Sequence, residues 1–330
     1  MGVVMNRRQL LQAGGAVAAT VAGRRLSAQT ASAKNRDEGY PKLSMITRYS
    51  PQRLAFAGKA GYECVEIVIS EAFGPQKLSD SDIEKVLATA KQAGVRILSI
   101  EAGWINHIDK DPQKRRENNA EFVRCLELGH RLGCTFVGTL SGGMPGAPLD
   151  EQVKAFVDVL NEQYAPVCEK LNLRMGWENY PHEENFATVP ATWKKVLDRV
   201  PSKQVGLEFD PSHLVRQFID PVKAAWDFRD RIYGFHAKDT EIIQPVLQQV
   251  GIHGDHWWRY RIPGQGSVAW PKLFNVLLEA RYDGAVSVEH EDDFYDEPGG
   301  DKHDELAASR KRGFVLAANF IRQYLPAPVR

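Results

Sequence analysis

Eight short apolar runs recur along the chain and alternate with segments of helical periodicity. The runs read KLSMIT, YECVEIVI, VRILSIEA, CTFVGTLS, LRMGWENY, QVGLEFD, IYGFHAKD and GAVSVEHE. Between them lie segments such as residues 80–94 and 115–133, whose apolar residues recur at spacings of three and four and which end in glycine, as helices do. Strands that are apolar on both faces and alternate with helices are typical of a parallel sheet covered by helices. Eight such units predict an α/β fold, the (β/α)8 or TIM barrel.

A doubly wound open sheet would produce the same alternation of strands and helices. That fold usually carries a glycine-rich phosphate-binding turn after its first strand, and no such turn follows KLSMIT. No low-complexity linker divides the chain into separate segments. We therefore expect a single catalytic TIM-barrel domain over residues 40–325.

The 330-residue chain has no net charge, because 42 lysines and arginines balance 42 aspartates and glutamates. Proteins that hold nucleic acid or an anionic membrane surface usually carry an excess of positive charge. The composition therefore favours a small-molecule partner over nucleic acid. The sequence carries no specific interface signal, and a homodimer is considered only because it is the commonest assembly.

Residues 1–33 resemble a twin-arginine export signal. Arg7 and Arg8 precede a short apolar stretch, AGGAVAATVA, and the small residues Ala31 and Ala33 suit a signal peptidase. The apolar stretch has about half of the ~20 residues that a helix needs to cross a bilayer. We therefore expect cleavage, a periplasmic or secreted protein, and no membrane attachment after cleavage.

The cysteines are not arranged as an obvious disulfide framework. Export to an oxidising compartment permits disulfides, but Cys64, Cys125, Cys134 and Cys168 lack any close paired spacing. They also form no CxxC pair of the kind that binds zinc or carries redox chemistry. We expect buried free thiols.

Polar side chains occur at the ends of the last four apolar runs. In a TIM barrel the chemistry takes place at the carboxyl ends of the strands, where the connecting loops converge. These four ends carry the potential metal ligands Glu178, Asp210, His236 and Glu289. Each residue alone has an ordinary explanation: a solvated glutamate, an aspartate that caps a turn, or a half-buried histidine. Their equivalent positions on adjacent strands make coincidence the weaker explanation.

Three carboxylates brought within a few ångströms would repel one another and raise one another's pKa unless a positive charge lay among them. A divalent cation supplies that charge. Three carboxylates with one imidazole suit manganese, magnesium, cobalt or zinc, and ligand type alone does not choose among these metals. The absence of thiolate ligands argues against a structural zinc site.

Five motifs resemble those of the sugar isomerase and epimerase family with the xylose isomerase-like barrel: WENYP, DPSHL, FHAKDTE, WWRYRIPGQG and VEHED. The resemblance spans the chain from about Lys42 to the last helical segment. Members of that family include tagatose and psicose epimerases, hydroxypyruvate isomerase, inosose dehydratase and enzymes that act on 3-keto-glycosides. The resemblance implies a bound divalent metal, commonly manganese, whose ligands fall by position on Glu178, Asp210, His236 and Glu289.

The resemblance also implies roles in proton transfer. The carbanion formed next to a carbonyl is stabilised when its charge spreads onto an oxygen held by a cation, so the reaction would pass through a metal-stabilised enediolate. In the family's epimerases two ligand glutamates lie on opposite faces of the substrate, one removing a proton and the other returning it. Glu178 and Glu289 occupy these catalytic positions. His213 and Glu184 fall at positions that contact substrate oxygens in the family.

Other residues near the predicted strand ends are second-rank candidates for substrate binding. Lys238 and Asp239 close the seventh run; Lys238 is placed to act on a substrate oxygen, whereas Asp239 is expected to orient local backbone. Glu101 and His107 lie at or after the end of the third run, and Trp104 between them is placed to pack on a sugar face.

The segment of residues 240–266 is too long for an ordinary connection within a compact domain. It is rich in aromatic and basic residues, which suit a lid over a sugar. The family's substrate arginine, expected soon after the metal-binding histidine, is absent there, and Arg259 or Arg261 is the candidate replacement. We expect a lid that supplies a substrate-binding arginine.

These features together predict an enzyme, a metal-dependent isomerase or epimerase of a keto-sugar or glycoside. Export favours an unphosphorylated substrate, because phosphorylated sugars are mainly intracellular. The same enediolate chemistry could end in elimination, which makes a 3-keto-glycoside lyase or hydrolase, or a keto-inositol dehydratase, the first alternative. A non-catalytic sugar-binding protein is the alternative outside enzymology. A DNA-repair nuclease with this barrel would need a basic groove and more histidines at the strand ends than this chain has.

Overall fold

The computed structural model describes residues 40–298 and 304–326. All of them except Tyr40 belong to a compact unit that spans Pro41–Pro326. The predicted export signal, residues 1–33, lies outside the described residues. Within the described part of the chain, no helix is both long and apolar enough to cross a membrane.

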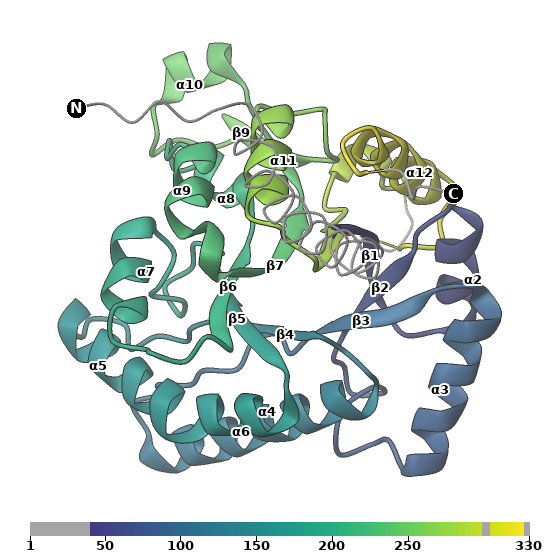
Figure 1. The fold of residues 1–330 in the computed structure, drawn as a ribbon. Helices are drawn as coiled ribbons and strands as arrows, with labels where there is room; N and C mark the ends of the chain where they lie inside the picture. The colour runs from purple at the N-terminus through teal and green to yellow at the C-terminus, as the bar shows by residue number, and fades with distance from the viewer. Residues whose placement is uncertain (1–39, 299–303, 327–330) are drawn as a thin grey trace, which may run out of the picture. The chain divides into compact units, whose positions relative to one another are not determined.

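Eight parallel strands form a closed barrel, which confirms the predicted fold (Figure 1). The strands lie around the barrel in chain order, so each strand pairs with the one before it and the one after it. The last barrel strand pairs in parallel with the first and closes the ring. The barrel strands are β1 (Lys42–Arg48), β2 (Cys64–Val68), β3 (Arg96–Glu101), β4 (Phe136–Thr139), β5 (Arg174–Glu178), β6 (Val205–Phe209), β7 (Ile232–Ala237) and β10 (Ala285–Val288).

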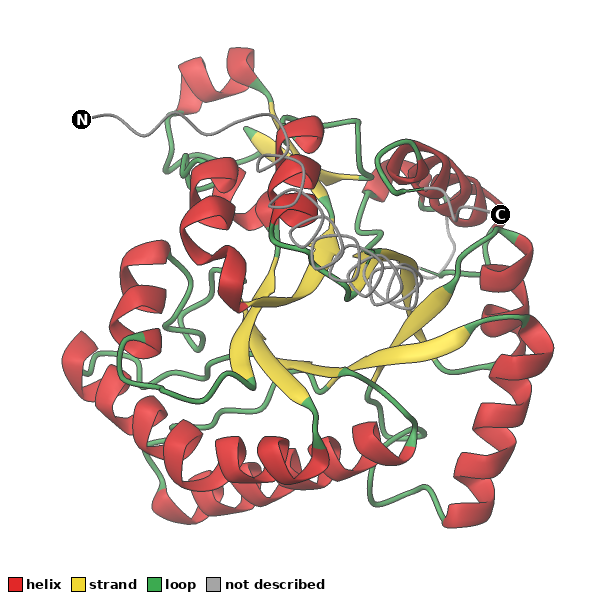
Figure 2. Cartoon of the chain, in the orientation of Figure 1, coloured by secondary structure: helices red, strands yellow, loops and turns green. Residues whose placement is uncertain are grey.

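Helices connect successive strands and surround the barrel (Figure 2). A π-helical turn, Leu160–Tyr164, joins two of them. Short 3-10 turns cover Arg229–Arg231 and Asp293–Tyr295. The α-helices are α2 (Pro51–Lys59), α3 (Asp80–Ala93), α4 (Pro112–Arg131), α5 (Leu149–Val159), α6 (Ala165–Leu171), α7 (Pro190–Leu197), α8 (Pro211–Val215), α9 (Pro221–Phe228), α10 (Gln244–Val250), α11 (Trp270–Glu279) and α12 (Ala308–Arg322).

The helix predicted over residues 80–94 begins and ends on local sequence signals. Ser79 precedes α3 and accepts a hydrogen bond from the backbone N–H of Asp82, while the Asp82 carboxylate accepts from the Ser79 N–H in return. This reciprocal pairing satisfies two N–H groups that lack a partner inside the helix. Gly94 ends α3 with a φ of 74°, a left-handed conformation that glycine adopts without strain.

A large apolar core fills the layer between the strands and the helices. Trp193 of α7, for example, packs on Phe209 of β6 with ring centroids 6.0 Å apart. The four cysteines are buried free thiols, as predicted. The core therefore holds the strand ends in fixed positions through helix packing on the outer face of the sheet.

The inside of the barrel is more polar than the prediction of strands that are apolar on both faces. Glu66 of β2 and Glu208 of β6 are fully buried. Each offers a carboxylate oxygen within 4.8 Å of the other. Because β2 and β6 lie on opposite sides of the ring, this proximity places both carboxylates inside the barrel. A strand glutamate that would ordinarily face solvent here faces the interior.

The long segment of residues 240–266 is an ordered excursion with secondary structure of its own. Strands β8 (Asp239–Ile242) and β9 (Trp258–Arg261) pair antiparallel, and α10 lies between them. Asp239 anchors its base, because its carboxylate accepts hydrogen bonds from the Trp270 indole at 2.8 Å and the Gly264 N–H at 3.0 Å. Asp239 therefore orients local backbone, as predicted.

We expect Gly58→Ala to destabilise the barrel. A Cβ atom at Gly58 in α2 would lie 1.9 Å from the carbonyl oxygen of Ala93 in α3, so the two helices would have to separate. Such overpacking typically costs about 1–3 kcal/mol. Thermal unfolding should show a lower midpoint for this variant, while Lys59→Ala, at the exposed neighbouring position, should unfold close to wild type. Equal midpoints for both variants would contradict the tight helix contact.

Candidate metal and sugar site

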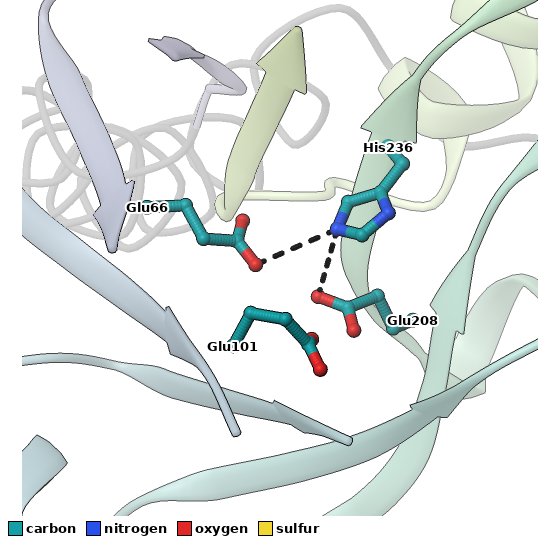
Figure 3. Close-up of side chains that lie close together, drawn as sticks. All are labelled: Glu66, Glu101, Glu208 and His236. Atoms are coloured by element: carbon teal, nitrogen blue, oxygen red, sulfur yellow. Dashed lines mark hydrogen bonds and ion pairs between the residues drawn. The ribbon is translucent and has the colours of Figure 1, made fainter. Parts of the chain in front are cut away.

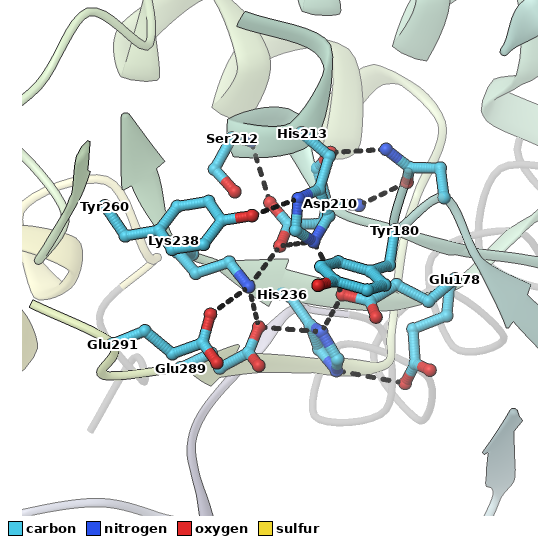
Figure 4. Close-up of polar contacts among 12 residues, drawn as sticks. Glu178, Tyr180, Asp210, Ser212, His213, His236, Lys238, Tyr260, Glu289 and Glu291 are labelled. Carbon is cyan, nitrogen blue, oxygen red and sulfur yellow. Dashed lines mark hydrogen bonds and ion pairs between the residues drawn. The ribbon is translucent and has the colours of Figure 1, made fainter. Parts of the chain in front are cut away.

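The four predicted metal ligands come together at the carboxyl ends of β5, β6, β7 and β10 (Figure 4). Each offers one ligand atom, and these atoms all lie within 4.8 Å of one another. The Nδ1 atom of His236 lies 2.9 Å from Glu178 Oε1 and 3.3 Å from Glu289 Oε2. We call this set, Glu178, Asp210, His236 and Glu289, the ligand quartet.

Asp210 divides its two carboxylate oxygens between the backbone and the site. Its Oδ1 accepts a hydrogen bond of 2.7 Å from the Ser212 N–H and so caps α8. Its Oδ2 has no hydrogen-bond partner in the described structure, although it is fully buried. Asn179 fixes the backbone on both sides, donating to the Asp210 carbonyl and accepting from its N–H. The hydrogen bond that caps α8 therefore leaves Oδ2 directed at the other three residues of the quartet.

His213, one turn after Asp210, lies against the quartet and is fully buried. Its Nε2 is 3.2 Å from Asp210 Oδ2 and 3.4 Å from Glu178 Oε1. Its Nδ1 lies 3.0 Å from the Tyr260 hydroxyl, which belongs to β9. The structure thus brings His213 to the site, and the hairpin of residues 239–261 fixes the orientation of its ring.

The quartet fits a divalent cation. Asp210 Oδ2 in the quartet and His213 Nε2 beside it form no hydrogen bond with the described residues and have only ion-pair contacts, at 3.2 Å or more. Buried polar atoms without partners are rare in folded proteins and usually indicate an ion or water. Three carboxylates and one imidazole are donors that manganese, magnesium, cobalt and zinc all accept.

Lys238 projects into the same cluster two residues after His236. Its Nζ lies 2.7 Å from Glu289 Oε2, 2.9 Å from Glu291 Oε2 and 3.2 Å from Asp210 Oδ2. Burial opposes its charge, but the carboxylates of Glu289 and Glu291 outweigh burial and hold the pKa of Lys238 well above its usual range. The same interaction overcomes the burial of Glu289 and holds its pKa at about 2.

A second group of carboxylates lies beneath His236 inside the barrel (Figure 3). The His236 Nε2 atom is 3.2 Å from Glu208 Oε1 and 3.5 Å from Glu66 Oε1. Ser287 donates a 2.5 Å hydrogen bond to the other oxygen of Glu66. Glu101 completes the group, and one ligand atom from each member lies within 4.8 Å of the others.

These deep carboxylates cannot all carry charge. Burial raises the pKa of Glu101 to about 7, and burial together with the charge of Glu101 raises the pKa of Glu208 well above its usual range. The Nε2 atom of His236 faces Glu66 and Glu208, so these residues would attract a proton on Nε2 from below. A cation bound in the quartet would then replace the proton on Nδ1 and use the lone pair of that atom.

A cavity of about 290 Å³ lies over the quartet. Trp104, predicted to pack on a sugar, forms part of its wall with 60% of its surface exposed and meets Tyr180 edge-on at 5.6 Å. Glu101 and Lys238 also line it, as do Tyr260 and Glu291, two residues that the sequence reasoning did not select. Glu291 could have been found, because it follows Glu289 by two residues and strand side chains alternate.

His107 and Glu184 are among the predicted substrate-binding residues that do not line this cavity. His107 is fully buried between the Tyr164 hydroxyl at 2.7 Å and the Thr139 hydroxyl at 2.9 Å. Burial lowers the pKa of His107 to about 3, so the ring is neutral and serves a structural network. Glu184 is exposed beside Trp104 and lines a separate hollow of about 40 Å³. The structure therefore does not bring either residue to the quartet.

The two candidate arginines of the hairpin are held by acidic partners. Glu241 accepts from Arg259 at 2.8 Å and from Arg261 at 2.8 Å. Arg261 also donates to Asp292 at 2.9 Å, so its guanidinium is committed to the hairpin base. Arg259 has a half-exposed side chain and lines a neighbouring groove, not the cavity over the quartet. Neither arginine reaches the quartet.

Comparison with known proteins bears on the fold and the family. Inosose dehydratase from Geobacillus kaustophilus is 23% identical over 235 residues, covering 66% of this chain and 74% of that protein. The apo crystal structure of 3-keto-D-glucoside 4-epimerase YcjR from E. coli has a TM-score of 0.64 at 17% identity, covering 86% of this chain and 99% of the other. A crystal structure of the IolI protein with a bound zinc atom has a TM-score of 0.64 at 19% identity, with coverages of 86% and 96%.

These structural similarities concern the whole barrel, and at such identities they establish the fold alone. The family model described as xylose isomerase-like TIM barrel matches residues 54–314, which include every barrel strand except β1. The match also includes all four residues of the ligand quartet. The chain therefore belongs to the xylose isomerase-like TIM-barrel family.

Proposed function

We propose that the protein is a divalent-metal-dependent isomerase or epimerase of an unphosphorylated keto-sugar or its glycoside. The ligand quartet carries this proposal, because it sets two carboxylates, Glu178 and Glu289, on either side of one imidazole at the floor of a cavity (Figure 4). The names of the relatives support it, since an inosose, which is a keto-inositol, and a 3-keto-D-glucoside both carry a ketone on a polyhydroxylated ring. The zinc-bound relative supports a resident divalent metal.

Glu178 and Glu289 suit the transfer of a proton at the carbon next to a carbonyl. A cation held by the quartet would supply a Lewis acid that stabilises the negative charge developing on the carbonyl oxygen. Burial alone would raise the pKa of Glu178, but the charge of a protonated His236 outweighs burial and holds that pKa well below its usual range, and a cation held by the quartet would take the place of that charge. Glu178 and Glu289 are therefore ionised at neutral pH, as a general base must be.

Other residues around the quartet bind and orient the sugar. Lys238 lines the cavity and the fully buried His213 lies behind it, and both place N–H groups beside the quartet, where substrate hydroxyl and carbonyl oxygens would lie. Trp104 offers an exposed ring that can pack on the apolar face of a sugar. Tyr260 closes the cavity from the hairpin side and limits the access of water.

Charge favours an unphosphorylated substrate. The carboxylates of Glu178, Glu289 and Glu291 line the cavity. Among the lining residues other than histidine, Lys238 alone carries a positive charge. A phosphate dianion would be repelled by this arrangement. The export signal expected over residues 1–33 supports the same choice, and we propose a periplasmic or secreted location.

A specific observation favours a glycoside substrate and, as a second candidate function, a 3-keto-glycoside lyase. A groove of about 410 Å³ lies beside the cavity, and Tyr260 and Glu291 line both. Trp258 and Phe294 supply aromatic walls to the groove, and Phe294 is 72% exposed. A second ring attached to the reacting sugar would fit there, and elimination would release it after proton removal.

We expect Asp210→Asn to abolish tight metal binding without unfolding the protein. Asparagine caps helices as well as aspartate does, so α8 is kept, but the anionic ligand is lost. Metal content after dialysis should fall from about one divalent ion per chain to almost none. Asp220→Asn is the matched control, because Asp220 caps α9 in the same way away from the quartet. Full metal content in Asp210→Asn would refute the assigned ligand set.

Glu289→Gln tests the proton transfer. We expect wild-type protein loaded with manganese to exchange deuterium from solvent into a keto-sugar, and the variant to exchange at least about 100-fold more slowly. Bound metal must be measured in both proteins, because Glu289 belongs to the quartet. Glu279→Gln, on the exposed face of α11, serves as the control. Undiminished exchange in Glu289→Gln would exclude Glu289 as a base.

Phe294→Ala tests the groove and separates the two substrate classes. We expect roughly a tenfold lower kcat/KM for a 3-keto-disaccharide and little change for the free keto-sugar, since only the disaccharide would reach the aromatic wall. Phe218→Ala removes another exposed aromatic side chain outside the groove and is the control. Equal losses for both substrates would argue against a second-ring site, and analysis of the products distinguishes elimination from epimerisation.

A further inference from the structure

We infer that Lys238 is a built-in cation that competes with the divalent metal for the quartet carboxylates, and that Glu291 moderates this competition by drawing the ammonium group aside. The inference deepens the proposed function and rests on its metal site. It assigns a role in metal affinity to Glu291, which lies outside the ligand quartet. The contacts of one buried ammonium group carry the argument.

Lys238 shares its carboxylate partners with the metal. Its Nζ contacts Glu289 at 2.7 Å and Asp210 at 3.2 Å, and both residues belong to the quartet. The side chain is only 2% exposed, so water cannot screen its charge from a neighbouring cation. Two cations that share the same carboxylates repel each other, so the ammonium group must weaken the binding of the metal.

Glu291 gives the ammonium group a partner that the metal does not use. Its Oε2 lies 2.9 Å from Lys238 Nζ, on the side of the lysine away from His236 (Figure 4). The ring of Tyr260 lies 4.6 Å from the same nitrogen and offers a further favourable contact for a cation. Glu291 and Tyr260 allow the ammonium group to stay in the site when a divalent metal binds the carboxylates of Glu289 and Asp210.

The competition predicts opposite signs for two substitutions. Lys238→Met removes the competing charge and should tighten metal binding. Glu291→Gln leaves the quartet residues as the carboxylate partners of Lys238 and should weaken metal binding. A purely structural lysine would give the reverse sign in the first variant, because removing it would disorder the carboxylates that bind the metal.

The test is the dissociation constant for Mn²⁺, measured by counting free Mn²⁺ with electron paramagnetic resonance in wild type, both single variants and the double variant. We expect Lys238→Met to lower the constant at least tenfold and Glu291→Gln to raise it several-fold. In the Lys238→Met background the effect of Glu291→Gln should shrink, because its action passes through the lysine. Lys194→Met removes a surface charge paired with Asp198 and controls for net charge.

Each outcome decides one part of the inference. An unchanged or raised constant in Lys238→Met, repeated in Lys238→Gln to guard against a folding defect, would overturn the competition. An effect of Glu291→Gln that is equal in both backgrounds would overturn the moderating role of Glu291, since it would then act on the metal directly. The absence of saturable Mn²⁺ binding in every variant, wild type included, would instead remove the proposed metal site itself.

Discussion

The balance of charge around His236 is the interaction on which the rest of the site depends. Above the ring, its Nδ1 atom meets the carboxylates of Glu178 and Glu289, and below the ring its Nε2 atom meets Glu66 and Glu208. So many buried carboxylates are unstable together unless protons or cations separate them. The imidazole and the ammonium group of Lys238 can provide this compensation, and the proposed divalent metal would add to it.

Closure of the barrel makes this concentration of charge possible. Glu66 and Glu208 come from strands on opposite sides of the ring, and they meet only because the sheet curves back on itself. An open sheet with the same strand order would hold the two carboxylates far apart. The deep carboxylates thus support a site whose upper ligands come from β5, β6, β7 and β10, and the two layers share a single histidine.

The hairpin built on β8 and β9 brings one of its side chains to the candidate site. Its base is fixed by Asp239, whose carboxylate accepts from the Trp270 indole and from nearby backbone N–H groups. From that base the Tyr260 hydroxyl reaches His213, and the Tyr260 ring contacts the ammonium group of Lys238. Arg259 and Arg261 of the same hairpin form ion pairs with Glu241, and Arg261 also pairs with Asp292. The hairpin therefore contributes a tyrosine hydroxyl to the site and not a guanidinium group.

Much of the site was open to prediction because parallel strands end at one edge of the barrel. The periodicity of the apolar runs locates the strand ends, and Glu178, Asp210, His236 and Glu289 follow from those ends. His107 could not be placed in the same way, because the loop after β3 turns its ring away from the cavity and against Tyr164. Glu66 and Glu208 were missed because a glutamate within a strand usually marks a solvent face, and local pattern does not distinguish the inside of a barrel from the outside.

The amino-acid sequence by itself determined the repeating strand and helix units, the closed α/β barrel and the residues that stand at its strand ends, since these depend on local periodicity and on the parallel order of strands. Only the tertiary structure decided which side chains share charge: the pairing of Lys238 with Glu291, the deep carboxylates under His236 and the contact of Tyr260 with His213. Such contacts join residues far apart in the chain, and their energies depend on distance and burial, which no local pattern specifies.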